Sequence, residues 1–227
     1  NDGTYDAPQD SADYVDTTAP SAPTSTSVAT NSDGTVTVDG TGEPGAVVTV
    51  TYPSGDTATA LVGSDGTWTA TSPNAENGGD ITASQEDQNG NTSSDVDAGT
   101  LVSIDTVVGN TDGTVTVTGT AEAGATVTIT YPNGETATTV AGTDGSFSVT
   151  STTTQPDDVT TADDILADAN DGTYDAPQDS ADYVDTTNPL PPTTTNVATN
   201  SDGTVTVDGT GEPGATVTVT YPSGDTA

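Results

Sequence analysis

The chain has 227 residues, of which 35 are Asp or Glu and none is Lys, Arg, His, Cys or Met, so its formal net charge is −35. Imidazole bases, thiolate nucleophiles, Schiff-base lysines and arginine clamps are therefore absent from the sequence, and we expect no enzyme activity. Nucleic acid and anionic membrane surfaces are excluded as partners because both are bound through Lys and Arg. The longest apolar runs, such as Ala46 to Val48, are too short for membrane insertion.

The apolar content is low, because Leu, Ile, Val and Phe together supply only 33 residues. Such a composition with such a charge is typical of disordered chains. The sequence also contains 52 threonines, however, and Thr is a β-branched residue that fits a pleated, half-buried surface. We therefore expect β-structure with a thin core. Because Cys is absent and carboxylates abound, a divalent cation is the candidate for extra stability.

Two blocks of sequence recur along the chain. The block DGTVTV begins at Asp33, Asp112 and Asp202, with spacings of 79 and 90 residues. The block Asn1 to Thr18 returns unchanged as Asn170 to Thr187, 169 residues later, and 169 is the sum of the two spacings. The repeating unit is therefore a pair of unlike domains.

Within each block, apolar and polar residues alternate strictly, as in Val36, Thr37 and Val38. This period of two predicts half-buried strands, and Gly, Pro, Asn and Asp mark turns every eight to twelve residues. The pattern predicts an all-β fold: tandem seven-stranded antiparallel Ig-like β-sandwiches in an extended string. The strands expected in the first full domain are Thr26–Thr30, Thr35–Asp39, Val47–Tyr52, Thr57–Val62, Thr67–Thr71, Ile81–Glu86 and Thr92–Asp97.

The repeats divide the chain into four parts. Residues 1–18 are expected to be the last strand of a preceding Ig-like domain plus a linker, and 19–99 and 100–187 two full domains. Residues 188–227 are expected to be the first half of a third domain. We therefore expect this sequence to be a segment of a longer array of domains.

Several motifs resemble the tandem bacterial Ig-like domains of giant secreted and surface adhesins that act in biofilms and on host cells. They are VDTTAP from Val15, VDTTNP from Val184, the block that continues from DGTVTV to TYPxG, and the steps Asp65 to Thr69 and Asp144 to Ser148. The resemblance implies a structural extender at the bacterial cell surface or outside the cell. It also implies that calcium at the domain junctions stiffens the string. One departure is Val96 to Leu101, which lacks the Pro of the other linkers and predicts a differently built joint.

Successive strands run in opposite directions, so alternate turns lie at opposite ends of a domain and acidic turns of two neighbours meet at each junction. Calcium prefers six to eight oxygen ligands in a tolerant geometry, which such loops supply. The expected Ca²⁺ ligands are Asp13, Asp16, Glu43, Asp65 and Asp87 at the first junction, Asp95, Asp97, Asp105, Glu122, Asp144 and Asp171 at the second, and Asp182, Asp185 and Glu212 at the third. For Asp33, Asp65 and their copies, the alternative is that Asp before Gly simply builds a turn.

The leading functional hypothesis is an extender segment whose partners are neighbouring repeats of the same polypeptide and other copies of the chain. The alternative is a subunit of an extracellular filament or surface layer, assembled through strand or lateral contacts between chains. A third reading is a module whose outward threonines bind glycan or ice, although polar outward faces are usual for any solvated sheet.

Overall fold

The computed structural model describes residues 15–156, 165–183, 188–211 and 215–227. All regular secondary structure in these ranges is β-strand, and no helix there could cross a membrane. The strands are β1 (Thr24–Thr30), β2 (Val36–Thr41), β3 (Val47–Thr51), β4 (Thr57–Leu61), β5 (Thr67–Thr71), β6 (Gly79–Glu86), β7 (Val96–Gly109), β8 (Val115–Ala121), β9 (Thr126–Thr130), β10 (Thr136–Val140), β11 (Ser146–Thr150), β12 (Ile165–Asn170), β13 (Asp179–Ala181), β14 (Thr193–Thr199) and β15 (Val205–Thr210).

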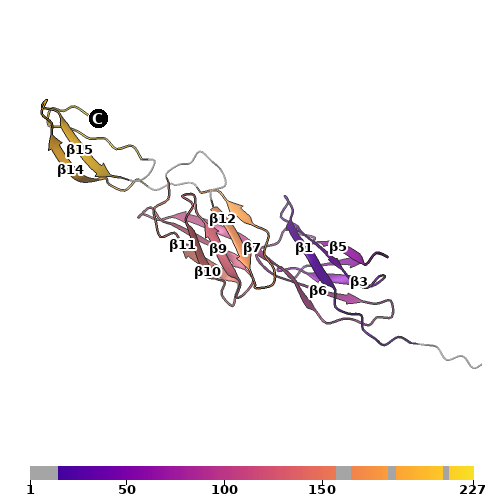
Figure 1. The fold of residues 1–227 in the computed structure, drawn as a ribbon. Coiled ribbons are helices and arrows are strands. Elements are labelled where there is room, and N and C mark those ends of the chain that lie inside the picture. The colour runs from indigo at the N-terminus through magenta and orange to yellow at the C-terminus, as the bar shows by residue number, and fades with distance from the viewer. Residues whose placement is uncertain (1–14, 157–164, 184–187, 212–214) are drawn as a thin grey trace, which may run out of the picture.

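The first domain is a sandwich of two antiparallel sheets (Figure 1). One sheet has the order β1-β2-β5, and the other is formed by β4, β3, β6 and the first part of β7. Tight turns with glycine at positive φ connect the strands, for example Gly55 between β3 and β4 and Gly66 between β4 and β5. This conformation explains why Gly recurs at these positions of the sequence.

The second domain repeats this arrangement. Its first sheet contains β11, β8 and the second part of β7, and its other sheet has the order β10-β9-β12-β13. Strand β7 therefore belongs to both domains, and one six-stranded sheet with the order β11-β8-β7-β6-β3-β4 runs through the pair. The predicted last strand of the first domain, Thr92–Asp97, begins instead at Val96 and continues to Gly109, across the expected boundary between residues 99 and 100.

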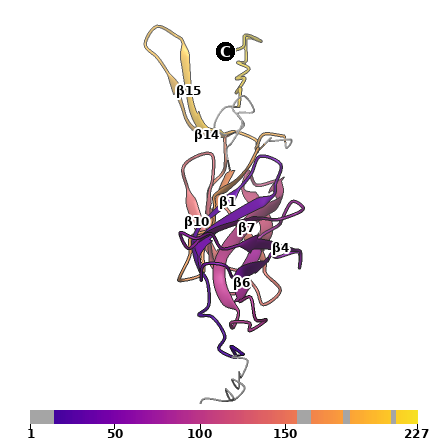
Figure 2. The same cartoon turned by 90° about the vertical axis from the view of Figure 1, so that its right-hand side faces the viewer.

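The third unit consists of the two-stranded sheet β14-β15 and a short turn that brings Thr220 opposite Thr226. Its hairpin stands apart from both sandwiches in the two views (Figures 1 and 2). The pairing of β14 with β15 copies that of β1 with β2, including a register shift after the second residue pair. Similar sequence has thus formed the same local structure at both places.

Each sandwich has its own thin core. Alternation within the strands predicts that the apolar residues point inward, and in the first domain Val36, Val38, Val48, Val50, Tyr52, Trp68 and Ile81 are all at most 3% exposed. The outward threonines of the same strands, Thr37, Thr49 and Thr51, are only partly buried. The predicted strand register and the all-β class are therefore confirmed, since a shift by one residue would have exchanged the two faces.

Trp68 in the first core and Phe147 in the second each pack on a glycine. Gly40 lies opposite Trp68 in the β2–β5 ladder, and Gly119 lies opposite Phe147 in the β8–β11 ladder. A Cβ atom on either glycine would collide with the aromatic ring beside it. The ring of Trp68 therefore packs directly on the backbone of β2, and the ring of Phe147 on the backbone of β8.

We predict that Gly40→Ala destabilises the first domain by about 1–3 kcal/mol, the usual cost of overpacking a well-packed core. Trp68 is the only tryptophan, so its fluorescence during thermal unfolding reports on this domain alone. Thr59→Ala on the exposed face of β4 is the control and should change stability by no more than about 0.5 kcal/mol. An unchanged Trp68 unfolding midpoint in the Gly40 variant would contradict the described packing.

Candidate functional site

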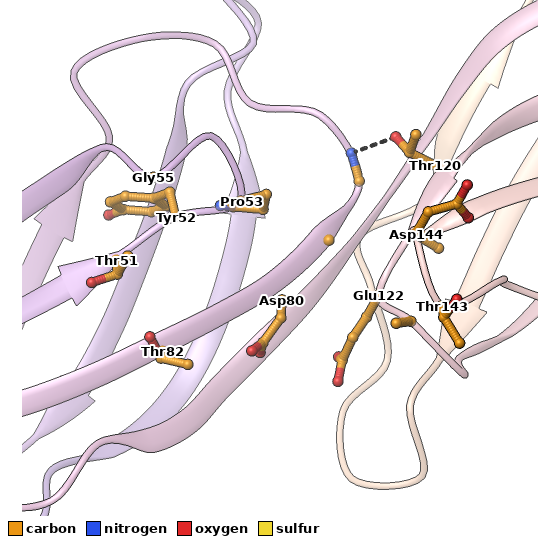
Figure 3. Close-up of a pocket in the computed structure, with 15 residues that line it drawn as sticks. Thr51, Tyr52, Pro53, Gly55, Asp80, Thr82, Thr120, Glu122, Thr143 and Asp144 are labelled. Carbon is orange, nitrogen blue, oxygen red and sulfur yellow. Dashed lines mark hydrogen bonds between the residues drawn. The ribbon is translucent and has the colours of Figure 1, made fainter.

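The joint between the first two domains gathers acidic side chains on one face of the shared sheet. Asp80 of β6 is paired with Thr100 of β7, so their side chains lie on the same face. The turn between β8 and β9 brings Glu122 of the second domain against this face, and Figure 3 shows Asp80 and Glu122 on facing sides of the gap. Asp97 on β7 and Asp171 after β12 complete the group, hereafter the joint cluster: Asp80, Asp97, Glu122 and Asp171.

The electrostatics of the joint cluster are unfavourable for ionised carboxylates. Burial together with the charges of Asp80, Asp171 and Asp97 raises the pKa of Glu122 to about 7. Burial, and then the charges of Asp97 and Asp171, likewise raise the pKa of Asp80. The pKa of Asp97 is raised for the same two reasons, with Asp171 as the neighbouring charge. With no basic residue in the chain, nothing internal offsets this repulsion.

Three oxygen atoms of the joint are buried and lack a hydrogen-bond partner within the described part of the chain. They are Oγ1 of Thr100, Oε2 of Glu122 and Oδ2 of Asp171. Thr100 is fully buried. Its hydroxyl lies near the Glu122 carboxyl and lowers the pKa of that carboxyl, but the two groups do not have the geometry of a normal hydrogen bond. Buried polar atoms without partners are costly, so an external group that binds oxygen would be favoured here.

A cavity of about 430 Å³ opens beside the cluster between the two domains. Its walls include Tyr52, Asp80 and Thr82 from the first domain and Glu122 and Asp144 from the second (Figure 3). Two cluster carboxylates therefore face a space large enough for a hydrated ion.

The donor set is chemically suited to calcium, because every available ligand atom is a carboxylate or hydroxyl oxygen. The carboxylates do not, however, form a ready-made ligand sphere. Among the described residues, no group of three or more His, Cys, Asp or Glu side chains lies close enough to hold a metal ion. A bound ion would have to draw the side chains of the joint cluster together.

The other acids expected at this junction lie elsewhere. Asp144 lines the cavity, but its Oδ1 accepts hydrogen bonds from the backbone nitrogen and the hydroxyl of Ser146 at 3.1 and 2.8 Å. Asp95 is exposed just before β7, and Asp105 is exposed on β7 at the register shift between Ile104 and Thr106. Of the six residues expected here, the structure brings together Asp97, Glu122 and Asp171.

At the leading end of the first domain, the expected ligands are tied into local structure. Asp65 Oδ1 accepts hydrogen bonds from the backbone nitrogen and hydroxyl of Thr67, and these bonds lower its pKa. The pKa of Asp87 is lowered mainly by hydrogen bonds from the side chain and the backbone nitrogen of Asn91. Asn91 also donates to the carbonyl of Asp16, at 3.2 Å, so it links the leading segment to the Asp87 turn. Glu43 is exposed, and its backbone nitrogen donates a hydrogen bond to Oε1 of Gln85.

Of the third junction, the structure describes only Asp182. Asp185 and Glu212, together with Asp13 of the first junction, lie outside the described residues. Asp33, Asp112 and Asp202 each cap their own turn through the Thr two residues later. At these three residues the structure therefore shows the alternative geometry, in which Asp before Gly builds a turn.

Asp80 is the member of the joint cluster that sequence reasoning left out. Its position before the apolar Ile81 places it at the end of β6 that faces the second domain, which the strand order already indicated. Its inclusion in the cluster depends on its pairing with Thr100, and that pairing exists because β7 passes straight through the joint. The missing Pro between Asp97 and Leu101 was the available signal.

Comparison with known proteins establishes the family. The sequence profile of the bacterial Ig domain matches residues 19–101 and again residues 103–177. The chain belongs to the bacterial Ig domain family. The two matched segments correspond to the two sandwiches that share β7, and no curated protein matches the chain.

Three solved structures are similar to this pair of bacterial Ig domains, each with a low TM-score. A structure titled as the BSP domain of a biofilm-associated protein is 24% identical, with a TM-score of 0.28, and the match covers 75% of this chain and 30% of that one. A Ca²⁺-stabilised adhesin of an Antarctic bacterium that binds ice is 25% identical, with a TM-score of 0.27 and coverage of 75% and 48%.

The third is part of a 1.5-MDa bacterial ice-binding adhesin, 19% identical, with a TM-score of 0.27 and coverage of 86% and 64%. The chain thus spans less than two thirds of each of these structures.

We predict that Glu122→Gln stabilises the bacterial Ig pair in metal-free buffer at pH 7.5. Because the folded-state pKa of Glu122 is raised from 4.5 to about 7, the wild type loses stability as pH rises from about 4.5 to 7. The gain in Tm of the variant should therefore be largest above pH 7 and disappear below about pH 4.5.

Circular dichroism melts between pH 4 and 8 test this prediction. Asp112→Asn is the control, since hydrogen bonds from Thr114 lower the pKa of Asp112 and its loss should destabilise the protein at neutral pH. A Glu122 variant that is less stable than wild type throughout this range would show that the joint cluster is not repulsive.

Proposed function

We propose that this chain is a structural extender from a bacterial surface or secreted adhesin, which supports cell adhesion and biofilm formation by spacing. Tandem domains of one family, joined end to end, support this role. The chemistry of the sequence supports it too, since the side chains most used in catalysis are missing and a spacer needs none. The expected partners are neighbouring repeats of the same polypeptide, and other copies of the chain.

We further propose that calcium stiffens the string at its junctions, and that at the joint cluster it stabilises the folded joint. The observation that carries this proposal is the gathering of Asp80, Asp97, Glu122 and Asp171 around buried, unpartnered oxygens in a protein without a single basic side chain. A divalent cation would remove the mutual repulsion of the carboxylates and give the unpartnered oxygens a ligand. Calcium suits the site better than magnesium, because calcium tolerates irregular geometry and more ligands.

In this proposal the residues that hold the ion are the four carboxylates and the Thr100 hydroxyl. Binding then requires these side chains to rotate toward a common ion. Extracellular calcium modules work at dissociation constants of about 10⁻⁴ to 10⁻³ M, a level found outside cells. The proposed location is therefore the cell surface or the extracellular medium, where the ion would be present.

The proposal predicts that EDTA lowers the melting temperature of the full chain relative to millimolar calcium at equal ionic strength. An ion that binds only the folded joint adds about 0.4–1.4 kcal/mol per site at roughly 1 mM calcium, for dissociation constants of about 10⁻³ to 10⁻⁴ M. For a body of this size that corresponds to a shift in Tm of roughly 1–6 °C. Isothermal titration calorimetry gives the stoichiometry and affinity on the same sample.

Asp97→Asn and Glu122→Gln should each reduce the calcium-dependent part of the Tm shift. Asp105→Asn is the matched control, because it removes the same charge from the same strand at an exposed position outside the joint cluster. If all three variants keep the full calcium shift, the ion binds elsewhere. If wild-type Tm is the same in calcium and EDTA, the joint cluster is only a strained acidic surface and the calcium proposal fails.

A further inference from the structure

We infer that the first two domains form one rigid body whose relative orientation is fixed by the backbone, with or without a bound ion. This inference rests on the proposed extender role for its biological meaning but not on calcium. It assigns the joint between β6 and β8 as a stiff element of the string. Any calcium-dependent bending then lies at joints that no strand crosses.

Strand β7 leaves no linker between the domains. Leu101 is paired with Gly79 of the first domain, and the next residue, Val102, is paired with Ala121 of the second. Leu101 is 3% exposed in the first core, and Val102 is 7% exposed against the second. Consecutive residues of one strand therefore anchor two different cores. A bend between them would break backbone hydrogen bonds and expose an apolar side chain to water.

The strands on either side of β7 also meet. The backbone nitrogen of Gly78, just before β6, donates a hydrogen bond to Oγ1 of Thr120 on β8 at 3.2 Å (Figure 3). The two backbones approach so closely that a Cβ on Gly78 would collide with the carbonyl of Thr120. The domains thus touch backbone to backbone, a contact that only glycine permits.

The opposite side of the joint is braced by the second domain. Asp179 on β13 accepts a hydrogen bond from the backbone nitrogen of Ile104 at 2.7 Å, which fixes β7 to the other sheet. Thr30 and Glu76 of the first domain and Pro177 and Gln178 of the second line one small cavity of about 160 Å³ on this side. Segments of both domains therefore lie close together on this side of β7 too, and a bend toward this side would press them against one another.

The segment that leads into the first domain is built differently. Residues 15–23 are outside any strand, and β1 begins only at Thr24. Two side chains hold this segment, with Gln85 donating to the carbonyl of Ser21 and Asn91 to that of Asp16. Side-chain bonds of this kind can break without disturbing a sheet. The two domains therefore have unlike leading segments, as expected from the Pro that one has and the other lacks.

Spin-label distance measurements on the full chain test the inference. The sequence has no cysteine, so labels attach only at introduced sites, and Thr59→Cys on β4 with Thr138→Cys on β10 places one in each domain at exposed positions. The pair Thr59→Cys and Thr69→Cys lies within one domain and gives the width due to the labels alone. We expect the distance distribution across the joint to be as narrow as the control, in EDTA as in calcium.

Adding Gly78→Ala should broaden or shift the distribution across the joint while the control pair within the first domain stays narrow. Ser148→Thr serves as its control, because it also adds one methyl group, at an exposed position of β11. If the control pair also broadens with Gly78→Ala, the domain has unfolded, and the wild-type distributions alone decide the matter.

A distribution across the wild-type joint that is broad in EDTA and narrows in calcium would overturn the inference and leave the calcium proposal standing. A distribution that is narrow in both, from a chain that binds no calcium, would support the inference and reject the calcium proposal. The two proposals therefore fail separately.

Discussion

The dominant physical constraint on this protein is a charge of −35 that no basic side chain offsets. Each carboxylate must be solvated, hydrogen-bonded by neutral groups or neutralised from outside. The two buried hydrophobic clusters contain no acid and consist of Val, Ala, Ile, Leu and a few aromatic residues, while many of the described acids lie at turns and strand ends. A thin core is then sufficient, because few buried positions need large side chains.

The carboxylates fall into two environments with opposite consequences. At the turns, Thr, Ser or Asn two to four residues later donates to the Asp and lowers its pKa, as at Asp33 and Asp87, so ionisation favours folding. Glu135 gains the same effect from residues distant in sequence, since hydrogen bonds from Thr153 and Thr152 lower its pKa to about 2. At the joint cluster, burial and neighbouring charges raise the pKa instead, so ionisation opposes folding there. Among the described carboxylates with a shifted pKa, those of the joint cluster are the ones whose repulsion an external cation would relieve.

The sequence was sufficient to predict the local structure because its periodicity is strict. Alternation placed Val48, Val50 and Trp68 inside, and sorting the turns by strand direction brought Asp97, Glu122 and Asp171 to one joint. Two features could not be predicted. Val96 to Leu101 reads as a linker rich in Asp, Ala and Gly, whereas pairing with both neighbours makes it part of one long strand. Which acids share a face then depends on that pairing, so Asp80 was missed, and Asp105, which lies at a register shift of β7, stands outside the joint cluster.

The most direct test of this account is an experimental structure of the chain grown in millimolar calcium, with anomalous scattering data to identify the ion. The account predicts a calcium peak at the joint cluster, bound by oxygens of Asp80, Asp97, Glu122 and Asp171, with β7 continuous from Val96 to Gly109. A joint without an ion, in which these carboxylates point apart into solvent while calcium occupies other acidic turns, would contradict it.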